Sequence, residues 1–381
     1  MTSKKISKNE KPVKKKVHAA PKSAGADKSP KTGDVKPIAL AIQGGGAHGA
    51  FSWGVLDRLI EDGRFKIEGV TGTSAGGMNA IAVAQGMMTG GNQQARATLK
   101  NFWEKISEAG KNSSLNNRGP VDKLLGKYTM HNSPGFLVFE ALSRMFSPYE
   151  LNPLGTDPLR KTIMECFDFD ALRKFKGMKA YLCATHVFTG KLRVFGLDEL
   201  SPEALLATAC LPTIHNAVKV EGEYYWDGGF IGNPVLFPLI YNCETPDIVL
   251  MQLNPTVRNT LPTTAREISD RLNEITNNAS VVREMRAVSL ISDMIDQGLL
   301  DKNKVKRVHM HLIEDEEVFS ELGWSSKLNT EWEFLSHLFE KGRKCADKWI
   351  KENYEHIGKK STAPIKEHFV GSVGHYPHPH V

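Results

Sequence analysis

Ser74 stands at the centre of a G-T-S-A-G stretch, residues 72–76, that could support nucleophilic chemistry. An apolar run at 67–71 predicts a buried strand before this stretch, and the almost wholly apolar residues 78–84 predict a helix after it. A G-x-S-x-G motif between a strand and a helix places the serine on a tight turn, with its hydroxyl exposed above the edge of the sheet. The next backbone N–H, that of Ala75, can donate to an oxyanion. Ser74 is therefore our candidate nucleophile.

A second glycine-rich turn, G-G-G-A-H-G at residues 44–49, follows an apolar run at 38–42 and precedes helical spacing over residues 50–61. The turn matches the G-x-G-x-x-G dinucleotide pattern, so nucleotide binding is one interpretation. However, the second strand ends in V-T-G, where a ribose-binding acid would be expected. The alternative is an anion hole, because glycines let backbone N–H groups approach a ligand and a helix N-terminus adds partial positive charge.

Asp227 is the candidate base, which a serine hydroxyl needs because it is a weak nucleophile at neutral pH. It follows Y-Y-W and precedes Gly228 and Gly229, and two glycines allow a sharp turn that can aim the carboxylate at Ser74. In a hydrolase with a histidine-containing triad, His309 or His311 could fill the base position. Neither histidine has neighbouring glycines at a strand end.

The elements that must position these residues alternate between strand and helix, which predicts an α/β sandwich with parallel strands. Two further strands are expected at 181–187 and 191–195 and another at 248–253, with helices at 205–210, about 263–300 and 331–354. The apolar stretch 136–145 could be a lid, an acyl-chain wall or ordinary core.

The composition distinguishes a basic N-terminal segment from a folded body. The 381 residues are 40% hydrophobic, which is enough for a core, and no apolar run approaches the roughly 18 residues of a membrane span. Residues 1–36 hold eleven lysines and three acidic residues, a net charge of +8, whereas the whole chain carries +6. The basic charge therefore belongs to a tail that we expect to be disordered, and a nucleic-acid-binding body is disfavoured.

The five cysteines show no metal or redox spacing, so we expect no metal site.

The three motifs, in this order and at these separations, resemble the patatin-like phospholipases over about residues 37–255. The resemblance implies a three-layer α/β/α sandwich with a central, largely parallel sheet, and hydrolysis of phospholipid or acylglycerol esters without calcium or another cofactor. It implies a Ser–Asp dyad without histidine, in which Ser74 is the nucleophile and Asp227 the base. The implied oxyanion hole uses backbone N–H groups of the first turn and of the residue after the serine: Gly44, Gly45, Gly46 and Ala75. The supporting motif glycines are Gly49, Gly72, Gly76, Gly228 and Gly229.

One residue departs from the pattern of this family. Members commonly carry Arg or Lys where this chain has His48, which puts a preference for phospholipid head groups in doubt but leaves the backbone oxyanion hole unaffected. His48 as a hidden general base is a further alternative.

The sequence therefore predicts a lysine-rich tail (1–36), a catalytic domain (37–255) and a helical C-terminal extension packed on it (256–381). We expect a cytoplasmic lipid acyl hydrolase without a signal peptide, whose tail can contact an anionic membrane and which binds no specific nucleic acid. The alternative functions are a nucleotide-binding protein that uses the first turn and a non-catalytic membrane-surface protein.

Overall fold

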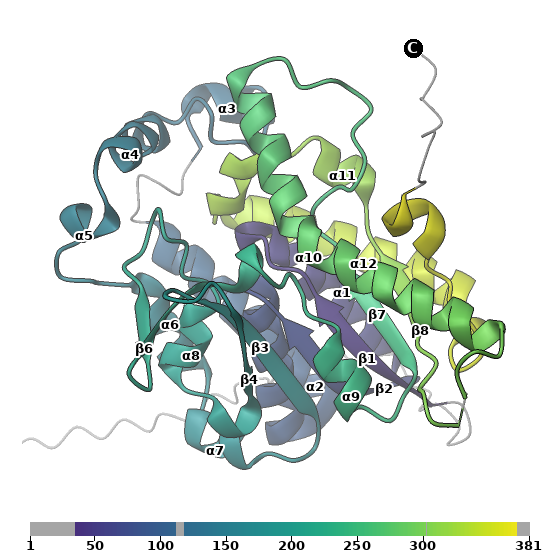
Figure 1. The fold of residues 1–381 in the computed structure, drawn as a ribbon. Helices are drawn as coiled ribbons and strands as arrows, with labels where there is room; N and C mark the ends of the chain where they lie inside the picture. The colour runs from purple at the N-terminus through teal and green to yellow at the C-terminus, as the bar shows by residue number, and fades with distance from the viewer. Residues whose placement is uncertain (1–34, 112–117, 302, 372–381) are drawn as a thin grey trace, which may run out of the picture.

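The computed structural model describes residues 35–111, 118–301 and 303–371 (Figure 1). Its centre is an eight-stranded sheet with strand order β5-β6-β3-β2-β1-β7-β8, in which β4 pairs with β3. The strands are β1 (Lys36–Ile42), β2 (Phe65–Gly72), β3 (Lys179–His186), β4 (Leu192–Gly196), β5 (Val218–Val220), β6 (Glu223–Asp227), β7 (Asp247–Met251) and β8 (His309–Ile313).

Most of the sheet is parallel. Strands β3, β2, β1, β7 and β8 run in one direction, whereas β4 and β6 pair with β3 in the antiparallel sense and β5 pairs with β6 likewise. Parallel neighbours need long crossover connections, which the helices supply. The predicted α/β fold with a largely parallel sheet is confirmed.

Helices account for most of the remaining described chain. They are α1 (Gly49–Asp62), α2 (Ala75–Lys111), α3 (Pro120–Leu124), α4 (Pro134–Met145), α5 (Pro148–Leu151), α6 (Pro158–Cys166), α7 (Phe169–Lys174), α8 (Pro202–Ala207), α9 (Phe237–Asn242), α10 (Ala265–Asp296), α11 (Glu316–Ser320) and α12 (Trp332–Asn353). Helix α2 is interrupted at Gly90 and Gly91, whose backbone angles are not helical. The helix expected at 205–210 ends earlier, at Ala207. The strand expected at 248–253 ends at Met251, because Gln252 already belongs to the following loop.

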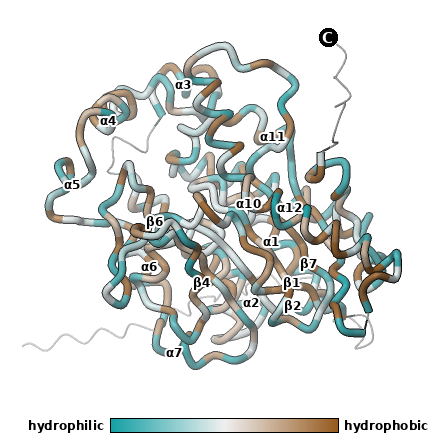
Figure 2. The backbone as a smooth tube through the Cα atoms, in the orientation of Figure 1, coloured by the Kyte–Doolittle hydropathy of each residue, from teal (hydrophilic) through white to brown (hydrophobic). Residues whose placement is uncertain are grey.

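The sheet is buried on both faces. In β1, Ile38, Leu40 and Ile42 belong to a core shared with α1, α2 and α12, whereas Ala39 and Ala41 face α9 and α10. In Figure 1, α9 and α10 accordingly lie on the viewer's side of the strands. In Figure 2, hydrophobic residues, shown in brown, lie around the labels of β1, β2 and β7. Helices on both faces explain why these strands are apolar throughout, and they make the fold a three-layer sandwich.

The C-terminal part shares this sheet and this core. Strand β8 pairs with β7, and α12 packs closely on α1. A side chain at Gly54 of α1 would overlap the Phe339 carbonyl oxygen, and one at Gly342 of α12 would overlap the Phe51 carbonyl oxygen. The two backbones can approach this closely only because both positions are glycine.

In the part of the chain that the structure describes, no helix is long and apolar enough to cross a membrane. Within the stretch 136–145, Phe136 is buried against Trp324, whereas Leu137, Val138 and Met145 are exposed. Residues 1–34, the greater part of the expected basic tail, lie outside the described residues.

Candidate active site

The register of the sheet brings Ser74 and Asp227 to the same level of its edge. Gly72, the last residue of β2, pairs with Leu182 of β3. Strand β3 continues past that point, and its Ala184 pairs with Asp227 at the end of β6. Ser74 lies two residues beyond Gly72, in the turn that follows β2, and it lines the same cavity as Asp227. The carboxyl end of β2 and the end of β6 thus meet at one site.

Ser74 occupies a strained turn. Its φ is +54°, a left-handed conformation that costs roughly 1–3 kcal/mol in a residue other than glycine. The turn is closed by the Gly76 N–H, which donates to the Thr73 carbonyl oxygen over 2.8 Å, and α2 begins directly at Ala75. A side chain at Gly72 would overlap the Gly76 backbone, and one at Gly76 would overlap the carbonyl of the residue that ends β1. The glycines of this motif are therefore needed for the close approach of backbone segments.

Asp227 is fixed by its own turn. The Gly229 N–H donates to Asp227 Oδ1 over 2.6 Å, and the Thr185 hydroxyl donates to the Asp227 carbonyl oxygen over 2.8 Å. A side chain at Gly228 would overlap the Cys183 carbonyl oxygen. Gly229 therefore helps to orient the carboxylate, and Gly228 allows the turn to approach β3 closely.

The charge state of Asp227 is set mainly by its surroundings. The residue is only 4% exposed, and burial raises the pKa of its carboxyl to about 7. The Gly229 N–H, the nearby Ser74 hydroxyl and the Lys327 ammonium act in the opposite direction and lower this pKa. A carboxyl with a pKa near 7 is a much better proton acceptor than a solvated one.

Backbone N–H groups gather beside Ser74. Within the described residues, the N–H groups of Gly45, Gly46 and Ala75 donate to no protein acceptor, and all three residues line the same cavity as Ser74. The Gly44 N–H, in contrast, donates to Asn233 Oδ1 over 2.6 Å. Gly44 remains part of the cavity wall, but its N–H is already engaged and is not free to bind an oxyanion.

A network of buried amide side chains supports the first glycine turn. Gln43 Oε1 accepts the backbone N–H groups of Leu253 (2.8 Å) and Asn254 (3.0 Å), and Gln43 Nε2 donates to Asn278 Oδ1 (2.9 Å). Asn233 adds the bond to Gly44 described above. These residues could not be predicted from the sequence, because they come from segments far apart in the chain and form no local motif.

The cavity that contains Ser74 and Asp227 has a volume of about 670 Å³ and mostly apolar walls. Its large apolar side chains come from α2, α6, α10, the loops around β5 and β6 and the turn before α12: Met78, Phe102, Trp103, Ile106, Leu159, Leu211, Ile214, Phe230, Leu272, Trp324 and Leu328. Such walls suit a hydrocarbon chain better than a nucleotide. The stretch 136–145 lines no part of this cavity, so it is not the acyl-chain wall, although Phe136 packs on Trp324, which does line it.

The histidines considered from the sequence lie elsewhere. His311 is buried, with Nε2 2.9 Å from Asp247 Oδ1 and Nδ1 2.9 Å from Thr362 Oγ1, and His309 Nδ1 lies 3.4 Å from the same carboxylate. Asp247 begins β7, whereas Ser74 follows the end of the parallel strand β2. Neither histidine is placed to assist Ser74, so the geometry does not support the triad.

His48 also lies outside the cavity lining. Its Nε2 is 2.8 Å from the Ser326 hydroxyl, and burial holds its pKa well below the usual value, with Lys327 adding to the effect. It is therefore neutral at pH 7. A different histidine, His215, does line the cavity, and its pKa is lowered by burial.

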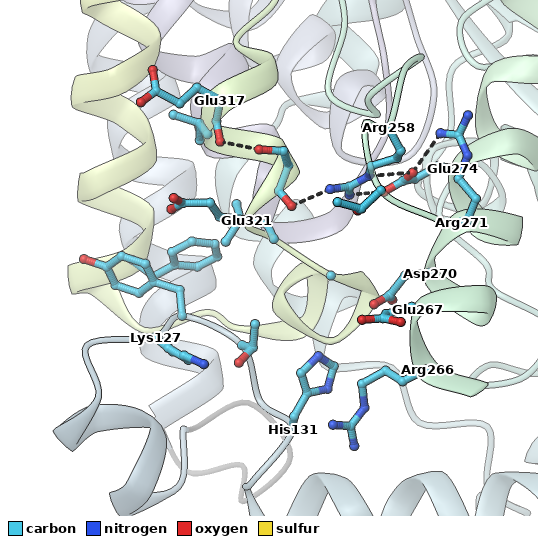
Figure 3. A pocket seen from close by; sticks show the side chains of 18 of the residues that line it. Lys127, His131, Arg258, Arg266, Glu267, Asp270, Arg271, Glu274, Glu317 and Glu321 are labelled. Atoms are coloured by element: carbon cyan, nitrogen blue, oxygen red, sulfur yellow. Dashed lines mark hydrogen bonds and ion pairs between the residues drawn. The ribbon is translucent and has the colours of Figure 1, made fainter. Parts of the chain in front are cut away.

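A second, larger pocket of about 980 Å³ has charged walls and contains neither Ser74 nor Asp227 (Figure 3). Separately, Glu314, Glu316 and His368 form a group of metal-type ligands among the described residues, and none of the three lines the cavity that contains Ser74 and Asp227.

The chain was compared with solved structures, with curated proteins and with models of protein families. Among solved structures, VipD from Legionella pneumophila is 13% identical, with a TM-score of 0.35 over 81% of this chain and 67% of its own. The type III effector ExoU is 16% identical, with a TM-score of 0.32 over 84% of this chain and 54% of its own. ExoU in its complex with SpcU from Pseudomonas aeruginosa is 14% identical, with a TM-score of 0.30 over 83% and 53%. The chain thus spans about two thirds of VipD and about half of ExoU.

No curated protein sequence matches this chain. The model of the family described as patatin-like phospholipase matches residues 40–240, just over half of the 381 residues. This region includes the first glycine turn, the G-x-S-x-G turn and Asp227, which the structure gathers around one apolar cavity. The chain therefore belongs to the patatin-like phospholipase family.

Proposed function

We propose that this protein is a lipid acyl hydrolase that cleaves carboxylic esters of phospholipids or acylglycerols through an acyl-Ser74 intermediate, with Asp227 as general base. The observation that carries the proposal is the meeting of a strained serine with a buried acid and three unengaged N–H groups in one apolar cavity. Membership of the family supports a lipid ester as the substrate.

In the first stage, Ser74 Oγ attacks the ester carbonyl carbon while its proton passes to the Asp227 carboxylate. The carbonyl electron pair moves onto oxygen, and the N–H groups of Gly45, Gly46 and Ala75 stabilise this oxyanion. The N-terminus of α2 begins at Ala75 and adds partial positive charge there. When the tetrahedral intermediate collapses, the C–O bond to the alcohol breaks and the alcohol takes the proton from Asp227.

In the second stage, a water molecule gives a proton to Asp227 and attacks the carbonyl carbon of the acyl-enzyme. The same N–H groups hold the second oxyanion. Its collapse breaks the bond to Ser74 Oγ, which recovers the proton from Asp227, and the fatty acid is released. Asp227 thus acts as base and then acid in each stage, and a pKa near 7 suits both roles at neutral pH.

A fluorophosphonate probe followed by peptide mass spectrometry tests this proposal directly. We expect the probe to label Ser74, and Ser74→Ala to lower kcat for a short p-nitrophenyl ester by about 10⁴-fold or more. Ser143→Ala, on α4 outside the cavity, is the matched control and should keep both labelling and activity. Full activity of Ser74→Ala in a folded protein would refute the proposal.

We also propose that the basic N-terminal tail brings the enzyme to anionic membranes. Each lysine near an acidic lipid surface contributes roughly 1 kcal/mol of attraction, and most of the tail's eleven lysines precede residue 35. Lys36 already belongs to β1, and its Nζ donates to the Tyr354 carbonyl oxygen over 2.7 Å. A deletion that tests the tail should therefore end at residue 34.

Deleting residues 1–34 should reduce co-sedimentation with phosphatidylserine-containing liposomes and leave hydrolysis of a soluble ester unchanged. The loss should shrink as salt is raised, because ionic screening already weakens the attraction of the full chain. Liposome binding that is equal for both chains at low salt would contradict the role of the tail.

A further inference from the structure

Lys327 places a single cation in the wall of the catalytic cavity. It lies in the 3₁₀ turn Trp324–Leu328, between α11 and α12, and among the residues that line the cavity it is the only lysine or arginine. Its backbone carbonyl oxygen lies against Gly46, where a side chain would overlap it, so this turn is in direct contact with the first glycine turn. No motif in the sequence marks Lys327.

The ammonium group of Lys327 is held by neutral partners. Its Nζ donates to Asn273 Oδ1 over 2.7 Å and to Asn254 Oδ1 over 2.8 Å. A lysine ammonium has three donors, and within the described residues the third has no acceptor. Two amide oxygens fix the position of the group without neutralising it, so one donor and the positive charge remain for a ligand.

The nearby carboxylates are engaged elsewhere. Glu274 pairs with Arg258 and Arg271, as Figure 3 shows. Asp270 accepts the Trp324 backbone N–H over 2.7 Å and thereby holds the turn that carries Lys327. The acids that face Lys327 from α10 are therefore occupied by arginines or by backbone. The remaining acid near it is the proposed base at the end of β6.

This arrangement also explains the departure at position 48. His48 is neutral and contacts Ser326, the residue next to Lys327, so it supports the turn and adds no charge to the cavity. The cation of the cavity is supplied instead from residue 327, outside the 40–240 region that the family model matches. It is thus a feature of this chain rather than of the matched motifs.

We propose that Lys327 binds the phosphodiester of a glycerophospholipid substrate, so that this enzyme prefers phospholipids to uncharged acylglycerols. The inference rests on the proposed ester hydrolysis and names its substrate class. A phosphate oxygen can accept the free ammonium donor in a charge-assisted hydrogen bond while the apolar walls hold the acyl chain.

The pH dependence should differ between the two substrate classes. Burial lowers the pKa of Lys327 to about 8, although Glu274, Asp270 and Asp227 oppose this effect, and the facing His48 is neutral. The ammonium is therefore lost as pH rises through about 8. For a phospholipid, kcat/KM should fall there, whereas for an uncharged ester it should show no such fall.

The test compares dihexanoylphosphatidylcholine with dihexanoylglycerol, which share acyl chains and differ in the phosphate-containing head group. In Lys327→Met the ratio of kcat/KM for the phospholipid to that for the diacylglycerol should drop about 10- to 100-fold. Lys327→Arg should restore most of this ratio and remove the fall above pH 8, because arginine stays charged. Arg266→Met, which removes an exposed cation from the second pocket, is the matched control and should keep the ratio.

Circular dichroism must show that the variants are folded. An unchanged ratio in folded Lys327→Met would overturn the inference while leaving the proposed hydrolysis intact. If instead the variant loses only inhibition by hexanoate, Lys327 binds the carboxylate product and the assignment to phosphate is wrong. Absence of hydrolysis of both substrates by the wild-type enzyme would reject the proposed function itself.

Discussion

Asp227 combines burial with a fixed orientation. The Gly229 N–H holds its Oδ1, and the scarcity of solvent around the carboxyl raises its pKa to about 7. In the proposed dyad this matters because no histidine mediates proton transfer, so the acid itself must accept the proton of Ser74. The strained backbone of Ser74 contributes separately, by directing the hydroxyl out of the turn and into the cavity.

At this scale we predict the pH dependence for an uncharged ester. A raised pKa means that Asp227 is protonated, and unable to act as base, below about pH 7. The value of kcat/KM should therefore rise as pH increases through about 7 and then level off. Initial rates measured between pH 5 and 9 give the midpoint. A profile that is already flat above pH 5 would show that the carboxyl titrates like a solvated one and would contradict the assignment of the base.

At the scale of elements, two strand–turn–helix units meet side by side because β1 and β2 are parallel neighbours with Ile42 opposite Gly72. Both turns therefore lie at the same edge, and the helices that follow them start there. The glycines in the two turns have different roles. Gly76 allows one backbone to contact another, whereas at Gly45 an added side chain would make only ordinary contacts, the shortest being 3.4 Å.

This difference predicts that two similar substitutions have very unequal effects on stability. Gly76→Ala forces a methyl group into the Ile42 carbonyl oxygen, so it should destabilise the fold by several kcal/mol or prevent folding. Gly45→Ala, with a φ of 175° that any residue can adopt, should change the free energy of unfolding by less than about 1 kcal/mol. Denaturant titration measures both. Equal stabilities of the two variants would mean that the backbone contact at Gly76 is not as tight as described.

At the scale of the whole molecule, the sequence predicts a catalytic domain at 37–255 and an extension at 256–381. In the structure these two parts share one sheet and one hydrophobic core. Strand β8 pairs with β7, α12 covers α1, and α10 covers the other face of the sheet. The turn that carries Lys327 also belongs to the C-terminal part and contacts the first glycine turn. We propose that the two parts form a single folding unit.

A chain that ends at residue 255 should therefore fail to fold, because it exposes the apolar face of α1 and the edge of β7. Soluble yield and cooperative thermal unfolding measure this. The matched control is a chain that ends at residue 371, which keeps every described element and should unfold like the full chain. A 1–255 fragment that unfolds cooperatively and reacts with the fluorophosphonate probe would show that the catalytic domain is independent.

The sequence by itself determined the α/β class and the two glycine turns, and it identified Ser74 and Asp227 as candidate site residues. These features depend on contacts between residues close in the chain. A strand followed by a glycine turn and a helix has a local signature in its apolar periodicity, and G-x-S-x-G specifies its own backbone geometry. Motif order and spacing then carried the resemblance to the family that the comparisons show.

Only the tertiary structure decided which other groups join the site. Gln43, Asn233 and Lys327 form no motif with their neighbours. Asn233 and Lys327 line the cavity, and Gln43 supports the first turn through its bonds to Leu253 and Asn254. In the folded chain, the Gly44 N–H is hydrogen-bonded to Asn233, and His48 lies against Ser326. The tertiary structure also places Leu272 of α10, which is exposed, in the wall of the cavity. Local pattern specifies how a segment folds, but which donors stay free and which charges stay unpaired depends on contacts between distant segments.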